Sequence, residues 1–300
     1  MFSGIIPALC TTFTPQDGVN TTALCELIEF LLGCHVDGFY IGGNTGEGLL
    51  MTEAERRLVA ETVTRQVAGR VPVIVHVGAL ATSVSERLAR HAREVNADAI
   101  ASIPPFYFAV GRRGIEAHYR RIAAAAGLPL YLYNIPSATQ VDLGAQFVCE
   151  LYQEGVVQGL KYTSYDQLGF REIIERSDSG LNLLAGPDEM LLPFLVMGAH
   201  GGIGTTYNIA PELFVDLYAA WQAGDLKRMQ QCQFQIDRVI LAVRDFGVVP
   251  AVKVALRMRG LDPGGPRMPL MPLTEEQEVQ LEAALRAINF FSLPPIEMDP

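Results

Sequence analysis

The chain has 300 residues, of which 49% are hydrophobic and 19% are charged, which is enough for one large domain or two ordinary ones. Its net charge is −10 with no basic tract to offset it, which argues against general binding to nucleic acids or to anionic membranes. No apolar run reaches the roughly 18 residues that a membrane span needs, and the first residues lack the basic and apolar regions of a signal peptide.

The cysteines and histidines point to a reduced protein without a metal. The 5 cysteines are an odd number with no CxxC pair, so we expect reduced and mostly buried thiols in a cytoplasmic protein. The 5 histidines are scattered, with no HxxxH and no Cys/His cluster. We therefore expect no metal site.

Short β-rich runs alternate with amphipathic helical stretches along the chain. Two helix starts have a hydroxyl followed by Glu three residues later, in "TEAE" (52–55) and "SVSE" (83–86), as a capping box does. The eight runs expected to form strands are 4–9, 38–42, 71–78, 98–103, 128–135, 156–162, 181–186 and 201–206.

Eight β–α alternations predict an α/β fold, a parallel sheet closed into a (β/α)8 or TIM barrel. A doubly wound sheet is the alternative, but no GxGxxG follows the first strand and there is no P-loop. From Pro211 onward the pattern is helical. We expect a barrel domain over 1–223 and a helical C-terminal extension over 224–300 packed on it, ending in a loosely held tail from Phe290.

Polar residues recur where the predicted strands end, and active sites of barrels lie at this end. They are Thr11, Thr12, Asn44, Thr45, Glu47, His76, Tyr107, Tyr133, Asn134, Lys161, Thr163, Asp188, Glu189, Thr205 and Thr206.

Lys161, in "GLKYTS", is one of only three lysines beside 20 arginines. Among apolar neighbours its ammonium is poorly solvated, so its pKa should fall. A neutral amine can attack a ketone to form a Schiff base, whose protonated imine serves as an electron sink for making or breaking a C–C bond, and Arg cannot do this. The alternative is a lysine paired with Asp188 or Glu189 in the barrel mouth.

The two tyrosines could move protons. Tyr133 ends "YLYNIP", where a phenol at the mouth could take or give a proton at the reacting carbon. It could equally be an aromatic packing residue. Tyr107 in "PPFYF" carries the weaker signal, because that run could simply be packing.

Two loops offer groups for substrate binding. The backbone N–H groups of "GGNTGEG" (42–48) and the Thr45 hydroxyl could cradle a carboxylate, unless this is an ordinary βα turn. "GPDE" (186–189) places Asp188 and Glu189 at a strand end. These carboxylates could accept hydrogen bonds from substrate hydroxyls, or could simply be the acidic first residues of the next helix.

Together, the motifs "GGNTGEG", "PPFYF", "YNIP", "GLKYTS" and "GGIGTTYNI" resemble those of the dihydrodipicolinate synthase / N-acetylneuraminate lyase family of class I aldolases. The resemblance runs from "FSGIIPALCTTF" to about residue 290. It implies a (β/α)8 barrel with a C-terminal helical extension, usually in a homotetramer, and a Schiff base on Lys161 with pyruvate or another 2-keto acid, with no other cofactor. By the same resemblance Tyr133 shuttles the proton, and Tyr107 matches a tyrosine that some members supply across a subunit interface.

The resemblance also assigns substrate-binding positions. The residues matching Thr45 and its neighbour Asn44 bind the pyruvate carboxylate. The resemblance adds further positions to the candidate site. In sialic acid lyases, the residues that match Asp188, Glu189 and Thr205 form hydrogen bonds with the sugar hydroxyls. The remaining candidate positions are Thr163, Gly186 and Ile203.

The lyase branch fits best. Synthases usually carry "YNxPxRT", whose arginine binds the second substrate, but this chain has Ala138 at that place. The expected reaction is cleavage of N-acetylneuraminate to pyruvate and N-acetylmannosamine. Because Asn44 replaces the usual Ser or Thr, and Pro187 stands where some lyases have an aromatic residue, a shorter 2-keto-3-deoxy sugar acid is an alternative. A synthase-like enzyme and a non-catalytic relative that binds 2-keto acids are further alternatives.

Overall fold

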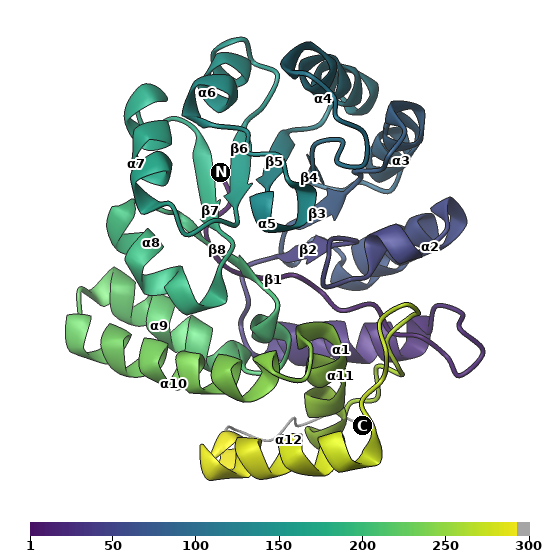
Figure 1. The fold of residues 1–300 in the computed structure, drawn as a ribbon, viewed down its shortest axis with the longest axis vertical. Coiled ribbons are helices and arrows are strands. Elements are labelled where there is room, and N and C mark those ends of the chain that lie inside the picture. Colours follow the sequence, from purple (N-terminus) through teal and green to yellow (C-terminus); the bar gives the residue numbers. More distant parts are fainter. Residues whose placement is uncertain (293–300) are drawn as a thin grey trace.

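The computed structural model describes residues 1–292, and its centre is a closed barrel of parallel strands (Figure 1). The strand order is β1-β8-β7-β6-β5-β4-β3-β2, and a parallel bridge between Ala8 and Tyr40 joins β1 to β2. All eight predicted strands are confirmed. Their bounds are β1 Gly4–Pro7, β2 Phe39–Ile41, β3 Val73–His76, β4 Ala99–Ser102, β5 Leu130–Asn134, β6 Gly159–Tyr162, β7 Asn182–Ala185 and β8 Gly201–Gly204.

Side chains of each strand alternate between the barrel interior and the surrounding helices. In β5, Tyr131 and Tyr133 belong to the interior cluster, whereas Leu130 and Leu132 pack outward. Because the strands are covered on both sides, almost all their residues are apolar. Burial of a polar side chain inside the barrel, such as that of Lys161 on β6, is therefore not explained by core packing.

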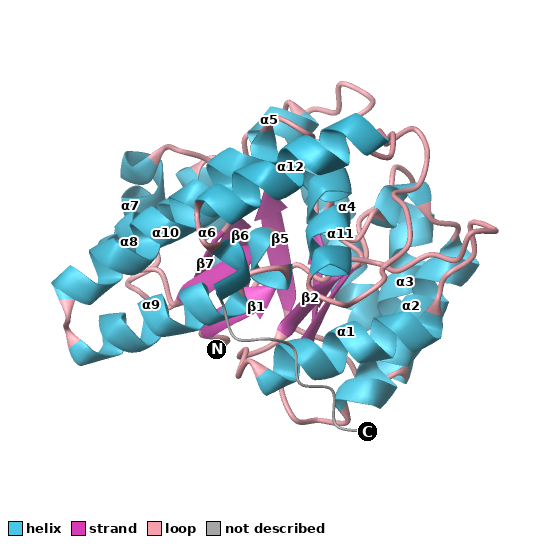
Figure 2. Cartoon of the chain, turned by 90° about the horizontal axis from the view of Figure 1, so that it is seen from below, coloured by secondary structure: helices cyan, strands magenta, loops and turns pink. Residues whose placement is uncertain are grey.

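Helices surround the barrel and continue beyond it, as predicted (Figures 1 and 2). Helix α10 packs along α9, and α11 and α12 lie beyond them at one side of the barrel. The helices are α1 Thr21–Gly33, α2 Glu53–Val67, α3 Thr82–Glu94, α4 Arg112–Ala126, α5 Pro136–Thr139, α6 Ala145–Gln153, α7 Gln167–Arg176, α8 Leu191–Met197, α9 Pro211–Ala223, α10 Leu226–Arg244, α11 Val248–Met258 and α12 Glu275–Ala287, with short 3-10 turns η1 Gly48–Leu50, η2 Asp188–Met190, η3 Thr206–Asn208 and η4 Phe290–Ser292.

A turn at Gly224, with φ of 71°, separates α9 from α10. Glycine accepts this left-handed conformation without strain, so the break is sharp. We propose it as the boundary between the barrel and the helical extension. The part of the predicted extension at 293–300 lies outside the described residues.

Two local predictions need correction, and one is confirmed. The capping box at Thr52 and Glu55 is present. The second, at Ser83, is wrong: α3 begins at Thr82 after Ala81, whose side chain has no group to cap it, and Glu86 instead accepts hydrogen bonds from Arg121. The loose tail expected from Phe290 is also wrong at its start, because the Phe290 side chain is 2% exposed. The rest of that tail lies outside the described residues.

The five cysteines are free thiols, and Cys10, Cys149 and Cys232 are buried, so most of them are buried as expected. Within residues 1–292, no helix is both long enough and apolar enough to cross a membrane.

Candidate active site

Lys161 lies inside the barrel mouth with its amine among aromatic rings. The side chain is 5% exposed, and Nζ is 4.3 Å from the ring centre of Tyr133 and 4.5 Å from that of Tyr40. Burial lowers the pKa of Lys161 to about 7, while the negative charge of Asp188 opposes this shift. At neutral pH a large fraction of the amine is therefore unprotonated and nucleophilic.

Tyr133 is the register neighbour of Lys161 across β5 and β6. It is 4% exposed, and its ring meets those of Tyr40 and His76 edge-on, with centres 5.9 and 6.1 Å away. Burial raises the pKa of the Tyr133 phenol well above its usual range, although the Thr163 hydroxyl opposes the rise. The phenol is therefore protonated at neutral pH and can act first as an acid.

The turn 42–48 brings Thr45 into the same mouth. Thr45 is 4% exposed, and its Oγ1 lies 2.6 Å from Oγ1 of Thr205, which follows β8. Gly48 permits the tight turn, because a Cβ there would lie 1.8 Å from the Gly42 carbonyl oxygen. Two hydroxyls from loops far apart in sequence thus meet beyond the carboxyl ends of β2 and β8. Asn44, the neighbour of Thr45, is exposed at the surface of this turn.

Asp188 holds the turn after β8 in place, a structural role that its position in the sequence does not indicate. It is 8% exposed, and its Oδ2 accepts hydrogen bonds from the backbone N–H of Thr206 (2.7 Å) and from the Thr206 hydroxyl (2.6 Å). Burial raises the pKa of Asp188 to about 6. This carboxylate therefore fixes the turn that carries Thr205. Glu189, in contrast, accepts a hydrogen bond from the hydroxyl of the exposed Tyr165.

A cleft of about 740 Å³ lies between the loops that follow β5 to β8 and helix α10, and its lining is mostly apolar with polar groups at several positions. Gly186 borders this cleft. A larger residue would not fit there, because a Cβ would lie 1.9 Å from the Thr163 hydroxyl oxygen. The residues from the barrel loops are Pro136, Ser137, Thr163, Ser164, Tyr165, Gly186, Pro187, Asp188, Glu189, Thr205 and Thr206, and those from α10 and α11 include Asp237, Arg244 and Val248.

A second, smaller cavity of about 240 Å³ borders Tyr133. Asn44, His76 and Ala138 line it together with mostly apolar residues such as Phe106. Burial lowers the pKa of His76 well below its usual range. The ring is therefore neutral at the pH at which Lys161 titrates.

Neither Ile203 nor Tyr107 lines a described cavity, and the buried Lys161 and Thr45 do not line one either. Ile203 is 1% exposed and belongs to the interior cluster of the barrel with Tyr133. Tyr107 is 73% exposed and packs against Phe108, with ring centres 5.1 Å apart. Within one described chain, Tyr107 lines neither cavity. The other predicted positions, namely Lys161, Tyr133, Asn44, Thr45, Thr163, Gly186, Asp188, Glu189 and Thr205, surround the barrel mouth.

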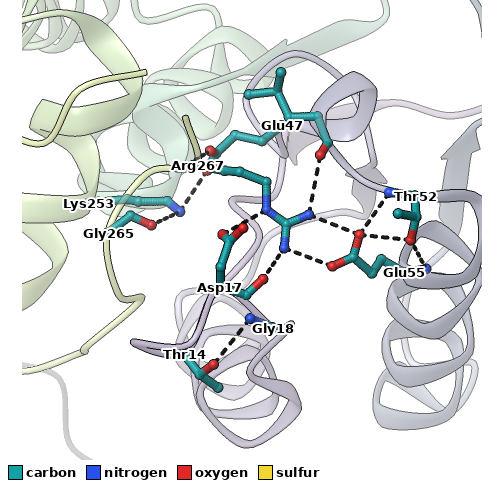
Figure 3. A network of polar contacts seen from close by, with 10 residues as sticks. Thr14, Asp17, Gly18, Glu47, Thr52, Glu55, Lys253, Gly265 and Arg267 are labelled. Atoms are coloured by element: carbon teal, nitrogen blue, oxygen red, sulfur yellow. Dashed lines mark hydrogen bonds and ion pairs between the residues drawn. The ribbon is translucent and has the colours of Figure 1, made fainter. Parts of the chain in front are cut away.

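Sequence reasoning missed several residues of this region. Tyr40 lies under the amine of Lys161 but reads as an ordinary strand aromatic, and no signal marks it out. Asp237 on α10 faces the cleft, and only the fold reveals this. The sequence shows Glu47 as a polar residue at a strand end. It gives no sign that Lys253 is the buried partner of Glu47 (Figure 3). Among residues 1–292, no three or more His, Cys, Asp or Glu side chains are grouped so as to hold a metal ion.

Comparisons with known proteins agree with this geometry. Residues 1–288 match the Dihydrodipicolinate synthetase family. The chain is 36% identical to N-acetylneuraminate lyase of Rhizobium meliloti (strain 1021), covering 95% of this chain and 94% of that protein. It is 35% identical to 4-hydroxy-tetrahydrodipicolinate synthase of Methanopyrus kandleri, covering 95% and 96%.

Solved structures give the same result. The prophage protein YagE from E. coli K12, in complex with pyruvate, superposes with a TM-score of 0.92 at 28% identity, covering 97% of this chain and 99% of that one. YagE belongs to the dihydrodipicolinic acid synthase family. The fold, the sequence and the arrangement of the barrel mouth thus lead to one assignment: this chain belongs to the dihydrodipicolinate synthetase family, whose members include N-acetylneuraminate lyases.

Proposed function

We propose that this protein is a class I aldolase that forms a Schiff base with a 2-keto acid and cleaves it to pyruvate and an aldehyde. The observation that carries the proposal is the amine of Lys161, buried between two aromatic rings with its pKa lowered to about 7. A buried lysine that served only as a charge would be better placed beside a carboxylate in direct contact.

The groups around Lys161 supply each proton transfer. The neutral amine attacks C2 of the keto acid, and the Tyr133 phenol gives its proton to the departing hydroxide, which leaves as water. The Tyr133 phenolate that remains then takes the proton of the C4 hydroxyl. As the C3–C4 bond breaks, its electrons move to the protonated imine and leave an enamine. The Tyr133 phenol, protonated again by the C4 hydroxyl, gives this proton to C3 of the enamine. Water then adds to the protonated imine and releases pyruvate, and the proton left on the amine of Lys161 returns to the Tyr133 phenolate.

The carboxylate of the keto acid binds at the turn that carries Thr45. The backbone N–H groups of this turn and the Thr45 hydroxyl are donors, and Thr205 supports that hydroxyl at 2.6 Å. This places C2 of the substrate above Lys161 and leaves the rest of the substrate to extend along the larger cleft.

The substrate that fits best is N-acetylneuraminate, cleaved to pyruvate and N-acetylmannosamine. The lining of the cleft of about 740 Å³ is mostly apolar, but it includes hydroxyls and carboxylates, among them Ser137, Glu189 and Asp237, that can hydrogen-bond an open sugar chain. A synthase that binds a second carboxylate is less well supported, because Ala138 lines the mostly apolar cavity beside Tyr133. A shorter 2-keto-3-deoxy sugar acid is the second candidate, favoured by the exposed amide of Asn44.

The proposed enzyme is a cytoplasmic homotetramer that uses no metal. Three large side chains in the loops after β3 and β4 are exposed, namely Leu80 (51%), Tyr107 (73%) and Phe108 (68%). Exposed apolar side chains of this size favour a subunit contact. Light scattering coupled to size-exclusion chromatography measures the mass of the assembly, and a monomer would contradict this part of the proposal.

Borohydride trapping tests the central step. Pyruvate and borohydride should add a stable label to Lys161, which peptide mass spectrometry locates. Lys161→Arg keeps a positive charge but loses the nucleophile, so both labelling and pyruvate release from 2-keto acids should be abolished. Label on Lys227 or Lys253 in this variant, or an unlabelled wild-type protein, would contradict the proposal. The second result would instead support a relative that binds keto acids without turnover.

A further inference from the structure

A buried ion pair lies directly behind the turn that carries Thr45. Lys253, on α11, places its Nζ 2.6 Å from Oε1 of Glu47, which lies in the turn. The side chains are 2% and 0% exposed, so water solvates neither charge. The pair therefore joins the C-terminal extension to a loop at the mouth of the barrel (Figure 3).

Both members of the pair have further partners that fix their positions. Lys253 Nζ donates to the Gly265 carbonyl at 2.9 Å and lies 4.4 Å from the ring centre of Phe13. Glu47 Oε2 accepts a hydrogen bond of 2.6 Å from the backbone N–H of Arg267. The Arg267 guanidinium is paired in turn with Glu55 at 2.8 Å, at the start of α2 (Figure 3).

Stability alone is a weak explanation for such a pair. Two charges lose their hydration when buried, and apolar residues of similar size often replace a buried ion pair without loss of stability. What the pair does provide is a fixed direction, since a carboxylate with two partners can occupy only one place. The role of the pair therefore depends on which part of the chain Glu47 holds in position.

Glu47 holds a strained and compact turn. Its φ is 55°, a left-handed conformation that a residue with a side chain adopts reluctantly. Its N–H donates to the Asn44 carbonyl, and the Gly48 N–H donates to the Gly43 carbonyl, each at 3.0 Å. Thr45 lies inside these two hydrogen-bonded loops. A shift of the Glu47 side chain would therefore move the Thr45 hydroxyl and the neighbouring N–H groups.

We propose that Lys253 is a positioning residue that acts through Glu47 to keep the turn 43–48 in the conformation that binds the carboxylate of the keto acid. This inference rests on the proposed Schiff-base function. It gives α11 a role in recognition of the carboxylate through Glu47, in addition to the contact of Val248 with the larger cleft. The pair acts on binding of the carboxylate and leaves the chemistry at Lys161 unchanged.

The test compares two probes that differ only in the carboxylate. Pyruvate carries it, whereas methyl pyruvate carries a neutral ester and the same ketone. The rate of borohydride trapping is measured against the concentration of each probe. The variants are Lys253→Met, Glu47→Gln and the double variant. The double variant removes both charges of the pair, so neither charge remains buried without its partner. Arg257→Met is the matched control, because Arg257 lies on the same helix but pairs with Glu278 at the surface.

In the double variant, the concentration of pyruvate for half-maximal trapping should rise roughly 10- to 100-fold, the loss of one or two hydrogen bonds to a charged group. The limiting rate and the result with methyl pyruvate should change little, and Arg257→Met should behave as the wild type. A purely structural role would weaken both probes alike. Lys253→Met and Glu47→Gln alone each leave one buried charge without its partner, so each should unfold more easily than the double variant.

Three results would overturn the inference. Equal losses for both probes would give the pair a structural role only, and unchanged discrimination in the double variant would show that the turn needs no anchor. In both cases the wild type is trapped by pyruvate, so the proposed function stands. A wild-type protein that pyruvate does not label would remove the proposed function and this inference together.

Discussion

Tyr133 and Lys161 are direct partners across strands β5 and β6, and the amine of Lys161 lies 4.3 Å from the centre of the Tyr133 ring. Register partners on adjacent parallel strands point to the same face of the sheet, so these two inward side chains lie side by side. The proposed nucleophile and the proposed acid–base group are thus held together by the sheet itself. Their separation does not depend on the conformation of a loop.

The rate of imine formation should rise with pH through about 7. Burial lowers the pKa of Lys161 to about 7, so the neutral amine becomes the main form above this value. At pyruvate concentrations well below saturation, the trapping rate should rise about tenfold per pH unit below the pKa and level off above it. Stopped reactions with borohydride at several pH values measure this. A midpoint near the ordinary lysine value of 10.5 would show that burial leaves the amine unperturbed.

Lys161→Met should stabilise the folded protein, most strongly at acidic and neutral pH. The pKa of Lys161 falls from 10.5 to about 7 on folding, so between these values the unfolded chain binds more protons and the wild type gains stability as pH rises. Below about 7 the buried ammonium carries its full cost, on the order of 3–5 kcal/mol. Urea unfolding of both proteins should show a difference that shrinks towards alkaline pH. A constant difference would contradict the shift.

Tyr133→Phe should separate imine formation from C–C cleavage. The variant loses one hydroxyl and little volume, so pyruvate should still label Lys161, while cleavage should slow by roughly 10²–10⁴-fold. The matched control is Tyr40→Phe. The Tyr40 ring also contacts the amine, at 4.5 Å, but among the described residues its buried hydroxyl has no hydrogen-bond partner.

Tyr40→Phe should therefore retain most of the cleavage rate and should unfold no more easily than the wild type. If both variants lost cleavage equally, the aromatic environment and not the Tyr133 phenol would be the cause. If Tyr133→Phe kept near-normal turnover, another group would carry the proton.

The barrel could be predicted, and Lys161 could be proposed as its reactive lysine, because their signals are local. Alternation of strand and helix patterns gives eight strands, and all eight lie where they were expected. Lys161 stands out because a lone lysine interrupts an apolar strand in a chain rich in arginine. The failed capping box at Ser83 shows the limit of such signals. The helix starts one residue earlier, and Glu86 binds Arg121 on the neighbouring helix.

Contacts between distant segments could not be predicted. Glu47 meets Lys253 only after the barrel closes and α11 packs against its mouth, and nothing near either residue marks the pair. The same holds for Asp188 and Thr206, which follow β7 and β8 and meet because these strands are neighbours. The sequence pattern gives no reason to assign different roles to the two carboxylates at 188 and 189. Tertiary structure gives them different environments.

Asp188 and Glu189 should therefore respond differently to loss of charge. Asp188→Asn keeps the shape, but a neutral amide oxygen is a weaker acceptor than a carboxylate for the two hydrogen bonds that Oδ2 takes from Thr206. The turn that carries Thr205 should loosen. We expect a lower melting temperature and a similar loss of kcat/KM for every 2-keto acid, whatever its length.

Glu189→Gln should instead act on long substrates alone. Glu189 lines the larger cleft and has an exposed partner, Tyr165, so the fold should tolerate the change. Removing a charged acceptor for sugar hydroxyls should lower kcat/KM for a sialic acid by the equivalent of about 1–3 kcal/mol. Imine formation with pyruvate should stay nearly constant, because pyruvate does not reach that part of the cleft. Measuring kcat/KM for a nine-carbon and a six-carbon 2-keto acid beside the melting temperature separates the two roles. If Glu189→Gln affected both substrates equally, Glu189 would not read the sugar chain, and the preference for N-acetylneuraminate would lose its main support while the aldolase assignment would stand on Lys161 and Tyr133.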